Sequence, residues 1–112
     1  MNITEVKNTV IVDTPHKVDV RRLYDRDNAQ VMHMTLKPGE SLKPHITPVD
    51  VFFYVLEGRP TVQIGEEIIA VEKDCLVDSP KGIVHCLSNE TNENARILVV
   101  KAPKPTAAGK LL

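Results

Sequence analysis

The chain has 112 residues, of which 42% are hydrophobic and 26% charged, a composition typical of one globular domain. Its 14 basic and 15 acidic residues leave a formal net charge of −1, so no excess of basic residues favours binding to nucleic acid or an anionic membrane. No apolar run approaches the ~18 residues of a membrane-spanning helix. We therefore expect neither nucleic acid nor a membrane as a partner.

The N-terminal segment and the two cysteines both predict a cytoplasmic protein. Met1 to Val12 lacks the basic start, apolar stretch and small-residue cleavage site of a secretion signal. Cys75 and Cys86 form neither a CxxC pair nor a framework of several bridges. We interpret them as reduced thiols rather than as a disulfide.

Short runs rich in Val, Ile, Thr, Phe and Tyr recur along the chain, separated by Pro, Gly, Asn and Asp. No segment combines a sustained helical period with capping signals. The expected strands are Thr9–Val12, Lys17–Tyr24, Gln30–Lys37, Val51–Glu57, Thr61–Ile64, Glu67–Val71, Cys75–Asp78, Val84–Ser88 and Arg96–Lys101. This pattern predicts one all-β domain over residues 1–103, either a sandwich or a barrel, followed by a loose tail over residues 104–112.

The segment Val51 to Leu56 is apolar at every position, so both faces of this strand should be covered. One face can meet the interior of the domain. The other needs a second layer or a second subunit. Together with the short chain and a possible exchange of the segment Thr9–Val12, this predicts a homodimer.

Two stretches of the chain resemble the paired motifs of the cupins. Gly39, His45 and Gly58 stand at three of the five positions of the first motif, with Thr47 in place of its second His and Val51 in place of its Glu. In the second motif, which spans residues 74–89, Pro80, Gly82, His85 and Asn89 match and Asp74 replaces the opening Gly. Asp is among the few other residues that tolerate a left-handed turn conformation. The resemblance implies a jelly-roll β-barrel, also called a double-stranded β-helix, of the RmlC-like cupin type.

The resemblance also implies a site inside the barrel. In metal-binding cupins, the two His and the Glu of the first motif and the His of the second hold one divalent metal. His45 and His85 are retained here, and imidazole suits iron, manganese, nickel, copper or zinc. Thr47 is at best a weak oxygen donor, and Val51 is no ligand. We expect Val51, Phe53 and Val55 to line the ligand pocket.

Asp50, His33 and Thr47 are the candidates to complete a metal shell. Asp50 precedes the Glu position, and strict alternation turns it away from the face of Val51 unless a bulge near Pro48 resets the order. His33 either faces the barrel interior or lies outside, with Met32, Met34 and Leu36 pointing inward.

The other polar candidates have simpler interpretations. His16 lies in a Pro-containing loop and is expected to be exposed, without a role. Cys86 should face away from His85 as a buried structural thiol. Pro80 and Gly82 shape the loop that presents His85, and Asn89 serves the following turn.

Two functional hypotheses follow. The first is a small cupin that binds a divalent metal in the barrel lumen; if it is an enzyme, the resemblance implies dioxygenation, isomerisation or decarboxylation of small organic acids or sugars. The second is a metal-free cupin that binds a small polar molecule as a sensor or carrier. No Ser-His-Asp or Cys-His arrangement and no phosphate loop is present, which argues against covalent catalysis.

Overall fold

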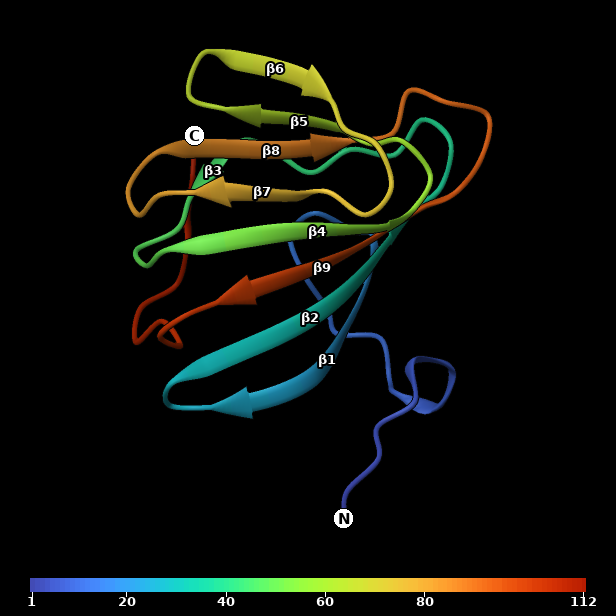
Figure 1. Ribbon diagram of the computed structural model, residues 1–112. Coiled ribbons are helices and arrows are strands. Elements are labelled where there is room, and N and C mark those ends of the chain that lie inside the picture. The colour runs from blue at the N-terminus through green and yellow to red at the C-terminus, as the bar shows by residue number, and fades with distance from the viewer.

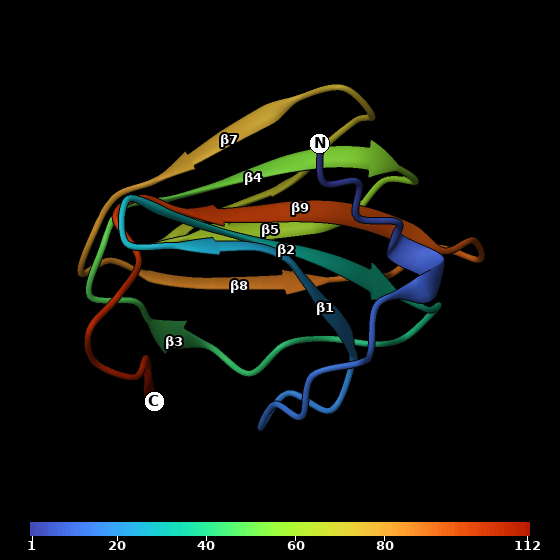
Figure 2. The ribbon, with the colours of Figure 1, turned by 90° about the horizontal axis from the view of Figure 1, so that it is seen from below.

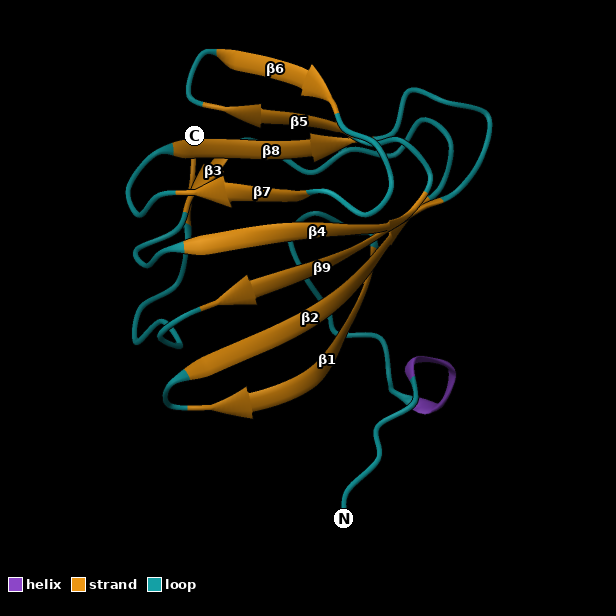
Figure 3. Ribbon diagram, in the orientation of Figure 1, coloured by secondary structure: helices purple, strands orange, loops and turns teal.

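The computed structural model describes residues 1–112, and almost all of its regular structure is β (Figure 3). One short 3₁₀ helix, η1 (Val6–Asn8), precedes the first strand. The strands are β1 (Asp19–Arg26), β2 (Ala29–Leu36), β3 (His45–Ile46), β4 (Val51–Glu57), β5 (Thr61–Ile64), β6 (Glu67–Ala70), β7 (Leu76–Ser79), β8 (Val84–Ser88), β9 (Ala95–Lys101) and β10 (Lys110–Leu111). No helix is long and apolar enough to cross a membrane.

The strands form two five-stranded antiparallel sheets. The first sheet has the order β1-β2-β9-β4-β7, and the second has the order β10-β3-β8-β5-β6. Neighbouring strands in each sheet are mostly distant in sequence, as in a jelly roll. The sheets face each other and curve into a barrel (Figures 1 and 2). The expected jelly-roll β-barrel is therefore confirmed.

Strict alternation on the central strands builds the core between the sheets. On β4, Val51, Phe53 and Val55 are buried, whereas Phe52 and Tyr54 on the opposite face are only half-buried. The same alternation operates along β9, and along β2 except at His33, which is also buried. The core cluster consists of Val18, Val20, Met32, Met34, Leu36, Leu42, Val51, Phe53, Val62, Leu87, Ala95, Ile97 and Val99.

The motif positions that favour glycine have left-handed backbone conformations. Gly39 and Gly58 have φ values of 85° and 79°. Asp74, which replaces the opening Gly of the second motif, has a φ of 65°, as its tolerance for this conformation predicted.

Asn89, the last position of the second motif, is a structural residue. Its buried amide donates hydrogen bonds to the carbonyl oxygens of Leu36 (2.8 Å) and Glu93 (2.7 Å). Its side-chain oxygen accepts from the backbone N–H and the hydroxyl of Thr91. The side chain thus joins the end of β2 to the turn before β9, in agreement with the expected turn-forming role.

Three segments differ from the sequence-based expectation. The proposed strand Thr9–Val12 makes only an isolated bridge between Ile11 and Arg21. The two-residue strand β3 is too short to give a periodic signal. The tail that was expected to be loose ends in β10, which pairs with β3 and satisfies backbone groups at that sheet edge.

Candidate functional site

A cavity of about 140 Å³ lies between the two sheets. Its body is apolar, with Val20, Met32, Met34, Val51, Phe53 and Val99 in the lining. The other lining residues include His16, His45, Thr47, His85 and Lys101, and no Asp or Glu lines the cavity. The cavity therefore offers an apolar volume together with imidazole, hydroxyl and ammonium groups.

His45 and His85 come together because β3 and β8 pair in a register that places the two residues opposite each other. Their Nε2 atoms are 3.0 Å apart. The loop before β8 presents His85: Gly82 has a φ of 79° and donates its N–H to the Thr47 carbonyl. The ring of Phe53 packs against the His85 ring in an edge-to-face arrangement, with the centroids 5.3 Å apart.

The hydrogen bonds assign one consistent set of neutral tautomers to this pair. Nδ1 of His45 lies 2.8 Å from the Lys43 carbonyl, which only accepts, so this nitrogen carries the proton. Nε2 of His45 then accepts from Nε2–H of His85. Nδ1 of His85 is left to accept from the Ser79 hydroxyl at 2.7 Å, and Thr47 Oγ1 lies 3.0 Å from the donating Nε2 of His85.

His16 lies beside this cluster and is half-buried, which corrects the expectation that it is exposed. Its ring centroid lies 4.7 Å from that of His45. Nδ1 of His16 accepts the backbone N–H of Lys43 at 2.9 Å, so the neutral ring carries its proton on Nε2. The ring of His16 makes no other hydrogen bond, so this Nε2–H has no partner within the chain. No sequence motif signals this residue, because a loop distant in sequence delivers it.

Burial keeps these imidazoles neutral. Desolvation, followed by the charge of His45, lowers the pKa of His85 from 6.5 to about 4. Desolvation and then His45, Lys43 and Lys101 lower the pKa of His16 to about 4 as well. The pKa of His45 is also lowered, mainly by desolvation. At neutral pH the cluster therefore carries no charge of its own.

Lys101 is the cation of the cavity, and the sequence interpretation did not include it. It follows Ile97 and Val99 on the inward face of β9, and that alternation is the signal that would have found it. Its ammonium makes no ion pair or hydrogen bond with any side chain. Desolvation and the nearby Arg22 lower its pKa below 10.5.

The other sequence candidates are divided between the lumen and the exterior. Thr47, Val51 and Phe53 line the cavity. Val55 is fully buried but lies outside the lining. Asp50 is exposed, and its carboxylate accepts the backbone N–H of Lys81 at 2.8 Å. No bulge turns it inward, so the structure does not bring it to the two imidazoles.

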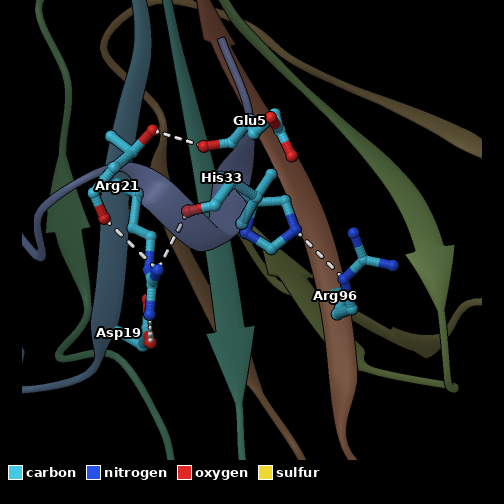
Figure 4. A network of polar contacts seen from close by, with 7 residues as sticks. Glu5, Asp19, Arg21, His33 and Arg96 are labelled. Atoms are coloured by element: carbon cyan, nitrogen blue, oxygen red, sulfur yellow. Dashed lines mark hydrogen bonds and ion pairs between the residues drawn. The ribbon is translucent and has the colours of Figure 1, made fainter.

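His33 faces away from the lumen, on the outer side of the first sheet, because Met32 and Met34 take the inward positions of β2. The N-terminal segment crosses over it (Figure 4). Nε2 of His33 accepts a hydrogen bond from Nε of Arg96 at 3.1 Å. Arg21, which is paired with Asp19, donates to the Val6 and Thr9 carbonyls and so fastens this segment.

The donor set accounts for only part of a metal shell. The two Nε2 atoms converge, and each Nδ1 has a hydrogen-bond partner, as the other ring nitrogen of a metal-bound imidazole usually does. However, no group of three His, Cys, Asp or Glu side chains is placed to hold a metal ion, and Lys101 lines the same cavity. Thr47 Oγ1 is the one further oxygen donor beside Nε2 of His85, because the Ser79 hydroxyl lies at Nδ1 on the other side of the ring. These residues fit a weakly held metal at most.

The cupin-domain family model matches residues 32–101, and the chain belongs to the cupin family. TT1209 from Thermus thermophilus is 29% identical, and the alignment covers 94% of this chain and 100% of that one with a TM-score of 0.80. The polyketide cyclase RemF from Streptomyces resistomycificus is 20% identical, with a TM-score of 0.86 over 100% of this chain and 85% of that one.

An RmlC-like cupin from Shewanella frigidimarina has a TM-score of 0.80 at 14% identity, over 93% of this chain and 92% of that one. A comparison with curated proteins finds no match. The chain is therefore a small single-barrel cupin. The similarities to these solved structures support the fold.

Proposed function

We propose that this cupin binds a small organic molecule in its lumen, as a sensor or carrier, without needing a resident metal. The observation that carries the proposal is the cavity itself, which has a volume of about 140 Å³ and a mostly apolar lining, with the paired imidazoles of His45 and His85 at its border. Concave apolar sites with a few convergent polar groups are the usual form of small-molecule sites. The pair is satisfied by hydrogen bonds within the chain, so a metal is not required to hold it in place.

The test uses two matched substitutions on β9. Val99→Phe places a ring in the lumen, whereas Val100→Phe makes the same change one residue along, on the outer face. The wild-type protein is titrated with ring-sized organic fragments, and backbone amide shifts are followed by NMR. We expect shifts at lumen residues in the wild type and in Val100→Phe, and none in a folded Val99→Phe. Shifts confined to the outer faces in the wild type would overturn the proposal.

A divalent metal held by His45 and His85 is the second candidate, and the 3.0 Å separation of their Nε2 atoms favours it. Thr47 and the bound molecule or water would supply the other ligands. Elemental analysis of protein purified without an affinity tag tests it. Close to one metal per chain, lost in both His45→Ala and His85→Ala, would support this candidate, and metal retained in either variant would contradict it.

We also propose that the protein acts in the cytoplasm. Cys75 is exposed and Cys86 half-buried, and the two are free thiols. Exposed unpaired thiols suit a reducing compartment. Fluorescence microscopy of the tagged protein in its source cell, with fractionation as a check, tests this location.

A further inference from the structure

Lys101 places a positive charge in a cavity that contains no negative one. Its ammonium has no ion pair or hydrogen bond within the chain, and the cavity lining has no carboxylate. Lys is rarely buried without a partner, because removing an ammonium from water costs free energy. The charge that lowers the pKa of Lys101, that of Arg22, is also positive. A counter-charge must therefore come from outside the chain or from solvent.

The free polar atoms beside Lys101 are donors. The tautomer assignment leaves Nε2–H of His16 without a partner. The acceptor nitrogens of the three imidazoles are all occupied: Nε2 of His45 accepts from His85, Nδ1 of His85 from the Ser79 hydroxyl, and Nδ1 of His16 from the backbone N–H of Lys43. The single Nε2–H of His85 is shared between Nε2 of His45 and Oγ1 of Thr47, so Thr47 keeps its own hydroxyl proton to donate. A ligand that meets these atoms must supply acceptors.

The cavity as a whole limits the size of the ligand. Its volume of about 140 Å³ is close to that of a cavity of about 150 Å³ that holds benzene. Met32, Met34 and Val99 offer contacts to an apolar body and no further hydrogen bonds from their side chains. A ligand that fills this volume therefore has about the bulk of one ring.

The geometry points to a small apolar monocarboxylate as the ligand, with Lys101 as its charge partner and His16 as a second donor. This inference rests on the proposed function and defines the chemical class of its ligand. One carboxylate supplies both the missing negative charge and two acceptor oxygens, and a ring or a branched chain of similar size fills the apolar volume.

Calorimetric titration with three matched probes tests whether the cavity prefers a negatively charged ligand. Benzoate, benzamide and benzylammonium share the ring and carry a negative, a neutral and a positive group. We expect benzoate to bind most tightly, benzamide more weakly, and benzylammonium not at all. In Lys101→Met the affinity for benzoate should fall about 10- to 100-fold, the usual contribution of a charge-assisted hydrogen bond. In His16→Ala it should fall about fivefold.

Lys104→Met is the matched control, because Lys104 pairs with Asp25 outside the cavity, and it should leave benzoate affinity unchanged. Lys101→Met should also unfold at a higher temperature than the wild type, since it removes an unpaired half-buried charge. Lys101→Gln is a second neutral variant in case the Met variant does not fold. If Lys101 instead stabilised the fold, Lys101→Met would unfold at a lower temperature than the wild type.

The outcomes separate this inference from the proposed function. If all three probes bind equally, or if both Lys101 variants keep wild-type affinity for benzoate, the lumen still binds small molecules but the ligand class is wrong. If neither benzoate nor the aliphatic probe isovalerate binds at millimolar concentration, the inference is overturned. If, in addition, no neutral or cationic fragment shifts lumen residues, the proposed function falls as well.

Discussion

His16 and His45 are held by the same residue of the chain. The backbone N–H of Lys43 donates to Nδ1 of His16 at 2.9 Å, and the carbonyl of Lys43 accepts from Nδ1 of His45 at 2.8 Å. One extended residue therefore sets the tautomers of two imidazoles. It leaves His16 with a free donor and turns the lone pair of His45 toward His85. The polarity of the cavity depends on this arrangement.

The free energy of unfolding should decrease as the pH falls from about 6.5 to about 4. In the unfolded chain an imidazole titrates near 6.5, whereas His85 and His16 titrate at about 4 in the folded protein. Between these values the unfolded chain binds more protons, so protonation favours unfolding. The stabilisation is fully present above pH 6.5. We expect a loss on the order of 3 kcal/mol, mostly from His85, which is 3% exposed.

Urea denaturation at a series of pH values measures this loss. His85 faces His45, His16 and Lys101, so the variant His85→Gln removes the most buried titrating group of the cluster. Its free energy of unfolding should vary less with pH than that of the wild type. Parallel pH profiles for the two proteins would show that His85 does not carry the effect.

The sequence predicted the barrel well because its central strands have unambiguous patterns. Val51–Glu57 and Thr61–Ile64 are observed with the expected bounds. His45 and His85 lie in motifs with a fixed order and spacing, which is why the structure brings them together as expected. The choice of face for His33 remained open in the sequence. Three apolar side chains on the alternate positions of β2 decide it.

His16 and Lys101 show where sequence reasoning stops. His16 reaches the cavity through a backbone contact with Lys43 in a distant loop, and no local pattern encodes such a contact. Lys101 did have a signal, because it continues the inward alternation of Ile97 and Val99. From the sequence alone, however, a lysine at the end of a strand is interpreted as a solvent-exposed residue.

Substitution by alanine should reduce the free energy of unfolding by different amounts at two motif glycines. Both Gly39 and Gly58 have a positive φ, which costs an alanine about 1–2 kcal/mol. A Cβ at Gly39 has no atom within 4 Å. A Cβ at Gly58 would lie 2.5 Å from the Asn94 carbonyl oxygen and 2.8 Å from Cα of Ala95. Gly58→Ala should therefore cost at least about 2 kcal/mol more than Gly39→Ala.

Chemical denaturation of both glycine variants measures the difference. Gly39→Ala is the control for backbone strain alone. Equal losses of stability in the two variants would mean that the backbone around Asn94 moves aside, so that close approach does not explain Gly58.

Replacing either lumen histidine should weaken ligand binding without unfolding the barrel. His45→Ala and His85→Ala each remove one member of a hydrogen-bonded pair that borders a cavity, and water can fill the space left behind. His85→Ala should be the more destabilising, because it also leaves Ser79, which is fully buried, without its partner. Circular dichroism and thermal unfolding check the fold, and fragment titration checks binding. Wild-type binding in both variants would place the site elsewhere.

The outer face of the first sheet supports the proposed homodimer. Phe52 and Tyr54 on β4 and Leu98 on β9 point away from the lumen and are half-buried, and Leu76 on β7 is 55% exposed. Arg21 on β1 fastens the N-terminal segment to this face through the Val6 and Thr9 carbonyls. Apolar side chains gathered on one sheet face commonly mark an interface. Strand β4 is apolar on both faces, and a second copy of the chain would cover its outer face.

Light scattering over a range of concentrations measures the oligomeric state. We expect a dimer for the wild type and a monomer for the double variant Phe52→Lys, Tyr54→Lys, because two ammonium groups in each copy would be desolvated at the interface. Ile68→Lys is the matched control: Ile68 is exposed on β6 of the other sheet, so this variant should remain dimeric. A wild-type protein that is monomeric at every concentration would contradict the prediction. If the wild type is a dimer and only Ile68→Lys dissociates it, the interface lies on the second sheet.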